Sequence, residues 1–172
     1  MNDLIWMTDE QRTGRPFSGP EKVVLAGFMD FQRDTLIWKV SGLTDDQASR
    51  AFPPSGMTLA GLVKHCAYVE RWWFQRVFDN RDVWILWLDG DESLEWKLAP
   101  GETLADVVAL YRQEIAISRE IVAAHDLGEH ARFPARAQHS LRRILIHMIE
   151  ETARHNGHAD LMREQVDGQT GE

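Results

Sequence analysis

The sequence is poor in cysteine, in net positive charge and in long apolar runs. Cys66 is the only cysteine, which excludes a disulfide within the chain and a thiolate-rich zinc site and favours the cytoplasm. The formal net charge of −8 provides no basic stripe for phosphates, so we expect no nucleic-acid partner. No window approaches the roughly 18 consecutive apolar residues of a membrane span, and the first residues do not form a signal peptide.

The remaining composition is that of an ordinary globular protein. Hydrophobic residues make up 44% and charged residues 27% of the 172 residues. A chain of this length can bury one sizeable core, and neither an internal repeat nor a low-complexity tract interrupts it. We therefore expect residues 1–172 to form a single domain.

Four segments have the apolar spacing of amphipathic helices, with hydrophobic residues at i, i+3 and i+4. They run from about residue 20 to 40, 58 to 78, 103 to 124 and 140 to 166. Thr58, Thr103 and Ser140 stand where helices usually begin, and Gly168 stands where the last one should end. The sequence therefore predicts an all-α fold.

The longest connection, "DNRDVWILWLDGDESLEWKLAPGE", separates the second predicted helix from the third. It holds Trp84, Trp87 and Trp96 and is long for a loop in a helical bundle. One interpretation is a lid that buries aromatic rings over an end of the bundle. The other is the wall of a ligand pocket, and the two are compatible.

The last predicted helix, which includes "HMIEETARHNGHADLMRE", places polar side chains among its apolar residues. Glu151 and His155 fall in the apolar sector, His147 and His158 lie at its border, and Glu150 points to solvent. A buried, ionised carboxylate without a partner is strongly disfavoured. The sequence therefore demands a compensating charge near Glu151.

A divalent metal ion would supply that charge. Glu151 and His155 lie one helical turn apart on one face, and His65 of the second predicted helix also points inward. Two histidines and a carboxylate leave coordination positions open for water or substrate. Two alternatives remain: the inward side chains bond to each other or to an arginine, or His155 and His158 form a different ligand pair.

Three further residues have weaker claims to a functional role. We expect Cys66 to be a packed core thiol rather than a nucleophile, because it points about 100° away from its neighbour His65. Arg154 is expected to pair with Glu150 on the surface rather than with an anionic substrate. Trp72 is expected near the core, as a candidate pocket wall.

The segments "SGMTLAGLVKHCAYVERWWFQRVF", "SLRRILIHMIEETARHNGHADLMREQVDG" and "SGLTDDQASRAFPPSG" resemble the DinB-like superfamily, and most of all its actinobacterial DinB or mini-circle protein branch. The resemblance implies an antiparallel four-helix bundle that holds a divalent metal through His65, Glu151 and His155. Many members carry histidine at the position of Glu151, but the thiol-dependent maleylpyruvate isomerases carry glutamate. His158 replaces a frequent glutamine and becomes a candidate outer-sphere residue or fourth ligand.

The resemblance also implies a function. We expect a metal-dependent transferase or isomerase that uses mycothiol or bacillithiol on a small electrophile, or a hydrolase that acts through metal-bound water. Zinc or nickel is expected first, and iron or manganese would also suit the donors. The alternative is a non-catalytic, stress-associated protein with a structural metal. No catalytic base is assigned, and a homodimer is allowed.

Overall fold

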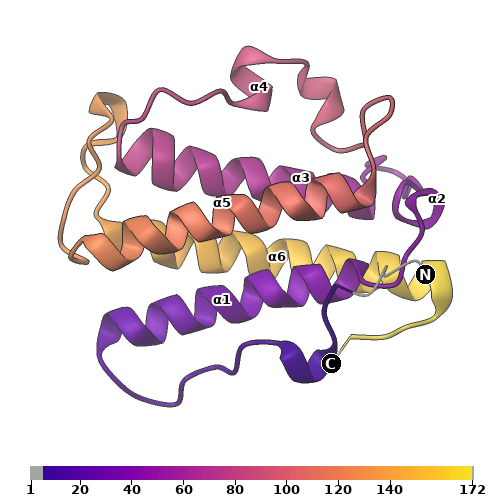
Figure 1. The fold of residues 1–172 in the computed structure, drawn as a ribbon, viewed down its shortest axis with the longest axis horizontal. Coiled ribbons are helices and arrows are strands. Elements are labelled where there is room, and N and C mark those ends of the chain that lie inside the picture. The colour runs from indigo at the N-terminus through magenta and orange to yellow at the C-terminus, as the bar shows by residue number, and fades with distance from the viewer. Residues whose placement is uncertain (1–5, 172) are drawn as a thin grey trace.

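The computed structural model describes residues 6–171, and that range contains helices and no β-strand. Four long helices form the body of the molecule (Figure 1): α1 (Glu21–Val40), α3 (Leu59–Glu70), α5 (Leu104–Ala124) and α6 (Leu141–Asp167). A short helix, α2 (Asp45–Ala48), joins α1 to α3. The predicted all-α bundle is confirmed.

The four helices run in two directions, with α1 and α6 pointing one way and α3 and α5 the other (Figure 1). The most extensive packing joins α1 to α6 and α3 to α5. Each of these two pairs is therefore parallel, while the pairs oppose each other. This arrangement arises because the long connection after α3 returns along the bundle before α5 begins.

The helix boundaries follow the expected capping residues. Thr58, Thr103 and Ser140 each accept a hydrogen bond from the backbone N–H three residues further on. Gly168 ends α6 in the left-handed conformation, with a φ of 78°, which glycine adopts without steric cost. The helix ends predicted from these capping residues are therefore confirmed.

The second predicted helix changes type near its end. After α3, residues Arg71–Phe78 continue as the π-helix η2, in which the backbone bonds span one residue more than in an α-helix. A uniform helical stripe was expected through residue 78. No signal in the sequence marks the change, because it lies in the pattern of backbone hydrogen bonds and not in the type of side chain.

The connection of residues 79–103 lies along α3 and η2 rather than over an end of the bundle (Figure 1). It contains α4 (Leu86–Asp89) and the 3₁₀ turn η3 (Glu92–Leu94). Its tryptophans contact the helix in reverse order: the Trp84 ring lies 5.7 Å from Tyr68, and the Trp96 ring lies 4.2 Å from His65. The expected position over an end of the bundle was wrong, and the connection covers one side instead.

The core forms two apolar clusters, and α3 contributes to both. Leu62 and Cys66 belong to one cluster, whereas Val69 belongs to the other. His65 lies on α3 between Leu62 and Cys66.

No helix within residues 6–171 combines the length and the hydropathy that crossing a membrane would require.

Candidate metal centre

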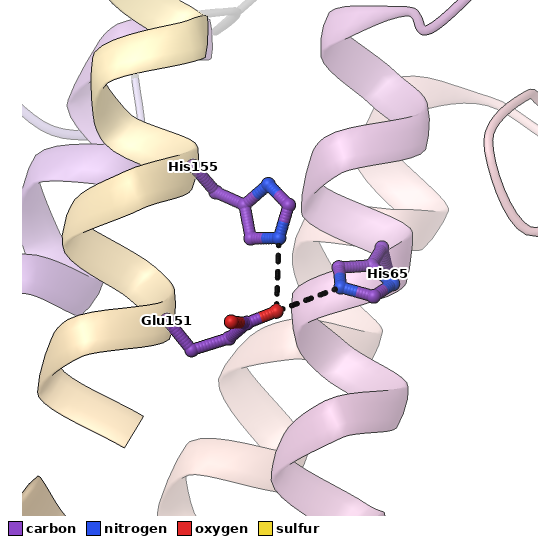
Figure 2. A group of neighbouring side chains, drawn as sticks. All are labelled: His65, Glu151 and His155. Atoms are coloured by element: carbon purple, nitrogen blue, oxygen red, sulfur yellow. Dashed lines mark hydrogen bonds and ion pairs between the residues drawn. The ribbon is translucent and has the colours of Figure 1, made fainter. Parts of the chain in front are cut away.

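Three polar side chains converge where α3 packs against α6 (Figure 2). His65 projects from α3, and Glu151 and His155 project from α6, one turn apart. Nε2 of His155 lies 3.1 Å from Oε1 of Glu151, and Nε2 of His65 lies 3.6 Å from the same oxygen. One donor atom from each residue lies within 4.8 Å of the other two, so the group could hold a metal ion.

The spacing of the donor atoms suits a transition-metal ion. Two ligands bound to zinc at about 2.0–2.1 Å are separated by roughly 3.3 Å in tetrahedral geometry. The two distances to the Glu151 oxygen, 3.1 Å and 3.6 Å, lie on either side of this value. Both nitrogen–oxygen separations are therefore close to the value expected for two ligands of one zinc ion.

The other ring nitrogen of His65 contacts a carboxylate. Nδ1 lies 2.6 Å from Oε1 of Glu95, in the connection between α3 and α5. An ionised carboxylate only accepts hydrogen bonds, so a neutral His65 must donate from Nδ1 and carry a lone pair on Nε2. That Nε2 is buried and has no hydrogen-bond partner among residues 6–171. In that neutral form two electron-pair donors, His65 Nε2 and Glu151 Oε1, face each other, which is the arrangement that a cation would stabilise.

The protonation states also suit metal binding. The pKa of Glu151 is lowered to about 2, first by hydrogen bonding with the His65 ring when Nε2 carries a proton, and against the opposing effect of burial. The pKa of His155 is lowered to about 4, mainly because burial disfavours its charged form. Near pH 7 both side chains are therefore deprotonated, as metal ligands must be.

Aromatic rings from the connection cover one side of the group. The Trp96 ring stacks on His65 with an interplanar angle of 22°, and the Trp87 ring lies 6.3 Å from His65. Trp72, the expected wall residue, lies 6.4 Å from Trp87 and is thus one ring removed from the imidazole. Its part in a pocket remains a prediction.

Sequence reasoning did not identify Glu95, Trp87 or Trp96 as neighbours of His65. The tryptophan-rich connection was consistent with a pocket wall. It lacks a helical period, however, so the sequence could not show which of its side chains would face α3.

His158 lies beside the group without joining it. Its ring centroid is 5.6 Å from that of His155, and the cluster of converging donors found within residues 6–171 does not include it. Its Nδ1 is buried and has no hydrogen-bond partner in the described part of the chain. A role for His158 as fourth ligand or outer-sphere residue remains a prediction.

Two other candidates have the structural surroundings that were expected. Cys66 is 2% exposed and packs in the core, and burial raises the pKa of its thiol well above the ordinary value. A buried thiol of this kind is a poor nucleophile. Arg154 pairs with Glu150 at 3.4 Å on the exposed side of α6.

Comparison with known proteins places this chain in a family. No curated protein matches the chain. A solved structure of a conserved protein from Enterococcus faecalis has a similar fold: the TM-score is 0.64 at 14% identity, over 88% of this chain and 100% of that one. The family model described as mycothiol-S-transferase matches residues 24–168, which agrees with the resemblance to the DinB-like superfamily. The chain belongs to the mycothiol-S-transferase family.

Proposed function

We propose that this protein is a metal-dependent transferase that joins a low-molecular-weight thiol, mycothiol, to a small electrophile. His65, Glu151 and His155 would hold the metal. The observation that carries the proposal is the pair of facing donors, His65 Nε2 and Glu151 Oε1, in a chain of a thiol-transferase family. The family description favours S-transfer over isomerisation and over hydrolysis by metal-bound water.

The donor set suits this chemistry. A divalent cation held there would lower the pKa of a coordinated thiol, so that the thiolate forms near neutral pH. Three protein donors leave at least one coordination position for the sulfur. One carboxylate and two neutral imidazoles neutralise only one of the two positive charges, and the remaining charge favours an anionic sulfur. Zinc and nickel are proposed first, and iron and manganese would also accept these donors.

The transfer itself requires few protein groups. The thiol loses its proton, the sulfur electron pair forms a bond to the electrophilic carbon, and the leaving group departs with the electrons of the broken bond. Trp87 and Trp96 cover one side of the group and would limit access of water from there. No residue is assigned as the base that takes the proton. His158 is the first to test, because its unpartnered Nδ1 lies next to His155.

The test is thiol conjugation by the metal-loaded protein. With mycothiol and an alkyl halide we expect turnover that chelation abolishes and that His65→Ala and Glu151→Gln each reduce by at least about 100-fold. Glu150→Gln is the matched control, since Glu150 is the adjacent glutamate but has an exposed side chain that points about 100° away from Glu151 around α6. Conjugation that is unchanged in both site variants would contradict the proposal.

A structural metal is the second candidate function, and the position of His158 favours it. If His158 moved to become a fourth ligand, no position would remain for substrate. Cobalt substitution distinguishes the two cases, because an added thiol changes the absorption of an open cobalt site and leaves a closed one unchanged. A response to thiol supports the transferase, and the absence of a response supports the structural role.

A further inference from the structure

Residues 95–97 are docked on α3 at several points. The carbonyl oxygen of Trp96 accepts a hydrogen bond from Oγ1 of Thr58 at 2.9 Å. The next carbonyl, that of Lys97, accepts one from Nζ of Lys64 at 3.1 Å. Lys64 is almost fully buried and also pairs with Glu102 at 2.5 Å. The same lysine therefore binds both ends of the stretch from Lys97 to Glu102.

Gly61 lets the backbone of this segment approach the helix closely. A Cβ atom at position 61 would lie 2.0 Å from the carbonyl oxygen and 2.1 Å from the carbonyl carbon of Trp96. Backbone atoms cannot move aside as the end of a flexible side chain can. Glycine is therefore required for the segment to lie this close, one helical turn before His65.

The docked segment brings two side chains to His65. Glu95 accepts the hydrogen bond from Nδ1 at 2.6 Å, and the Trp96 ring stacks on the imidazole with its centroid 4.2 Å away. The side chains of His65 and Glu95 are 12% and 15% exposed, so water competes weakly for this hydrogen bond. The bond opposes a flip of the ring, and the stacked indole restricts rotation of its plane.

The second imidazole lacks this support. Nδ1 of His155 is buried without a hydrogen-bond partner in the described part of the chain. Its Nε2 contacts Glu151. The two residues lie one turn apart on α6, so the helix itself holds them close together. His65 comes from a different helix, so its ring needs a separate constraint to present Nε2 towards Glu151.

We propose that Glu95 is a positioning residue, which fixes the tautomer and orientation of His65 so that Nε2 is free to bind a metal ion. This inference rests on the proposed function for the role of the site, although the hydrogen bond to His65 stands independently of it. A carboxylate behind a metal-binding histidine holds the ring and strengthens the ligand. The connection of residues 79–103 thereby completes the site that α3 and α6 begin.

The first test is the tautomer of His65 in the metal-free protein, measured by ¹⁵N NMR of the histidine rings. In the wild type we expect the ring proton on Nδ1. In Glu95→Ala we expect most molecules to carry this proton on Nε2. Glu92→Ala is the control, since it removes an exposed glutamate from the same connection. A His65 tautomer that is the same in wild type and Glu95→Ala would overturn the proposal.

The second test is zinc affinity, measured by competition with a chromophoric chelator. Loss of an outer-sphere partner of a metal-binding histidine weakens metal binding by about 10–100-fold. We expect a loss of this size in Glu95→Ala, a smaller loss in Glu95→Gln, which can still accept the hydrogen bond, and no change in Glu92→Gln. Zinc affinity within twofold of wild type in Glu95→Ala would overturn the positioning role.

The two tests separate this inference from the proposed function. If the wild type binds no zinc, the transferase proposal fails, and the NMR result alone decides whether Glu95 sets the tautomer. If zinc binds and conjugation occurs while Glu95→Ala leaves both the tautomer and the affinity unchanged, only the role of Glu95 fails.

Discussion

Fully buried carboxylates occur in one region of this bundle and a half-buried one in another, and their charges are balanced in different ways. In the first region Glu70 and Glu114 are 0% and 1% exposed, and each is paired with arginine. Both oxygens of Glu70 accept hydrogen bonds from Arg33 at 2.7 Å. Glu114 accepts one from Arg71 at 2.7 Å and one from Gln75 at 2.5 Å.

Glu151 belongs to the second region and contacts imidazoles instead. The ion pairs found for it within residues 6–171 are those with His65 and His155. His155 cannot balance the charge near pH 7, because its pKa is lowered to about 4. The comparison shows that the two fully buried glutamates, Glu70 and Glu114, are each paired with a guanidinium. At Glu151 the chain supplies two imidazoles, which is a donor set that could hold a metal ion.

The largest expected difference between the regions follows from one substitution made in each. Glu70→Gln removes the anion that binds two nitrogens of the buried Arg33 and leaves Asp30, at 2.8 Å, as its remaining anionic partner. We therefore expect the free energy of unfolding to fall by about 3 kcal/mol. Glu151→Gln in the metal-free protein replaces contacts with imidazoles rather than with a buried guanidinium, and we expect a smaller loss, of about 1–2 kcal/mol after allowance for solvent screening. Urea denaturation with chelator present measures both values. Equal losses in the two variants would remove the distinction.

Metal addition should stabilise only through the second region. Zinc at about 100 times its dissociation constant should raise the free energy of unfolding of the wild type by about 2.7 kcal/mol. Glu70→Gln should show the same increment from its lower starting point, whereas Glu151→Gln should show little. Thermal or urea unfolding with and without zinc provides the measurement. An equal increment in Glu151→Gln would place the ion elsewhere.

Acidification sharpens the comparison through His155. Its pKa is about 4 in the folded protein and 6.5 ordinarily, so the unfolded chain binds the proton more readily. The stability of the metal-free protein should therefore fall as the pH drops from about 6.5 towards 4, by on the order of 1 kcal/mol at pH 5 after allowance for solvent screening. His155→Gln should lack this part of the loss. Unfolding at pH 7 and pH 5 in both proteins checks it, and identical slopes would contradict it.

Below about pH 4.5 Glu151 adds a loss of the same sign. Its pKa is lowered to about 2, so the unfolded state takes up the proton first and stability declines from about 4.5 downwards. Glu151→Gln should remove this second step while it retains the first. If the loss of stability below about pH 4.5 persists in Glu151→Gln, it arises from another carboxylate.

The part of the site on the helices could be predicted from the sequence. Glu151 and His155 share a face because they are one turn apart, and the apolar stripe of their helix shows which face is buried. His65 was placed by the same periodicity on another helix. Helical spacing thus predicted that the three side chains lie close together, although α3 and α6 are far apart in the chain.

The rest depends on contacts that no local period describes. Glu95 reaches His65 because residues 95–97 dock beside Gly61, and the sequence of an irregular connection does not show such docking. The pairing of Arg33 with Glu70 joins α1 to α3 over 37 residues, and it was equally hidden. The parallel pairing of α3 with α5 follows from the path of the connection rather than from either helix.

The most direct test of the central claim is a crystal structure of the purified protein with diffraction measured at the absorption edges of zinc, nickel, iron and manganese. The account predicts one anomalous peak about 2.0–2.2 Å from donor atoms of His65, Glu151 and His155, with a coordination position left open. It would be contradicted by a structure without a peak there, in which the three side chains lie apart or a guanidinium pairs with Glu151.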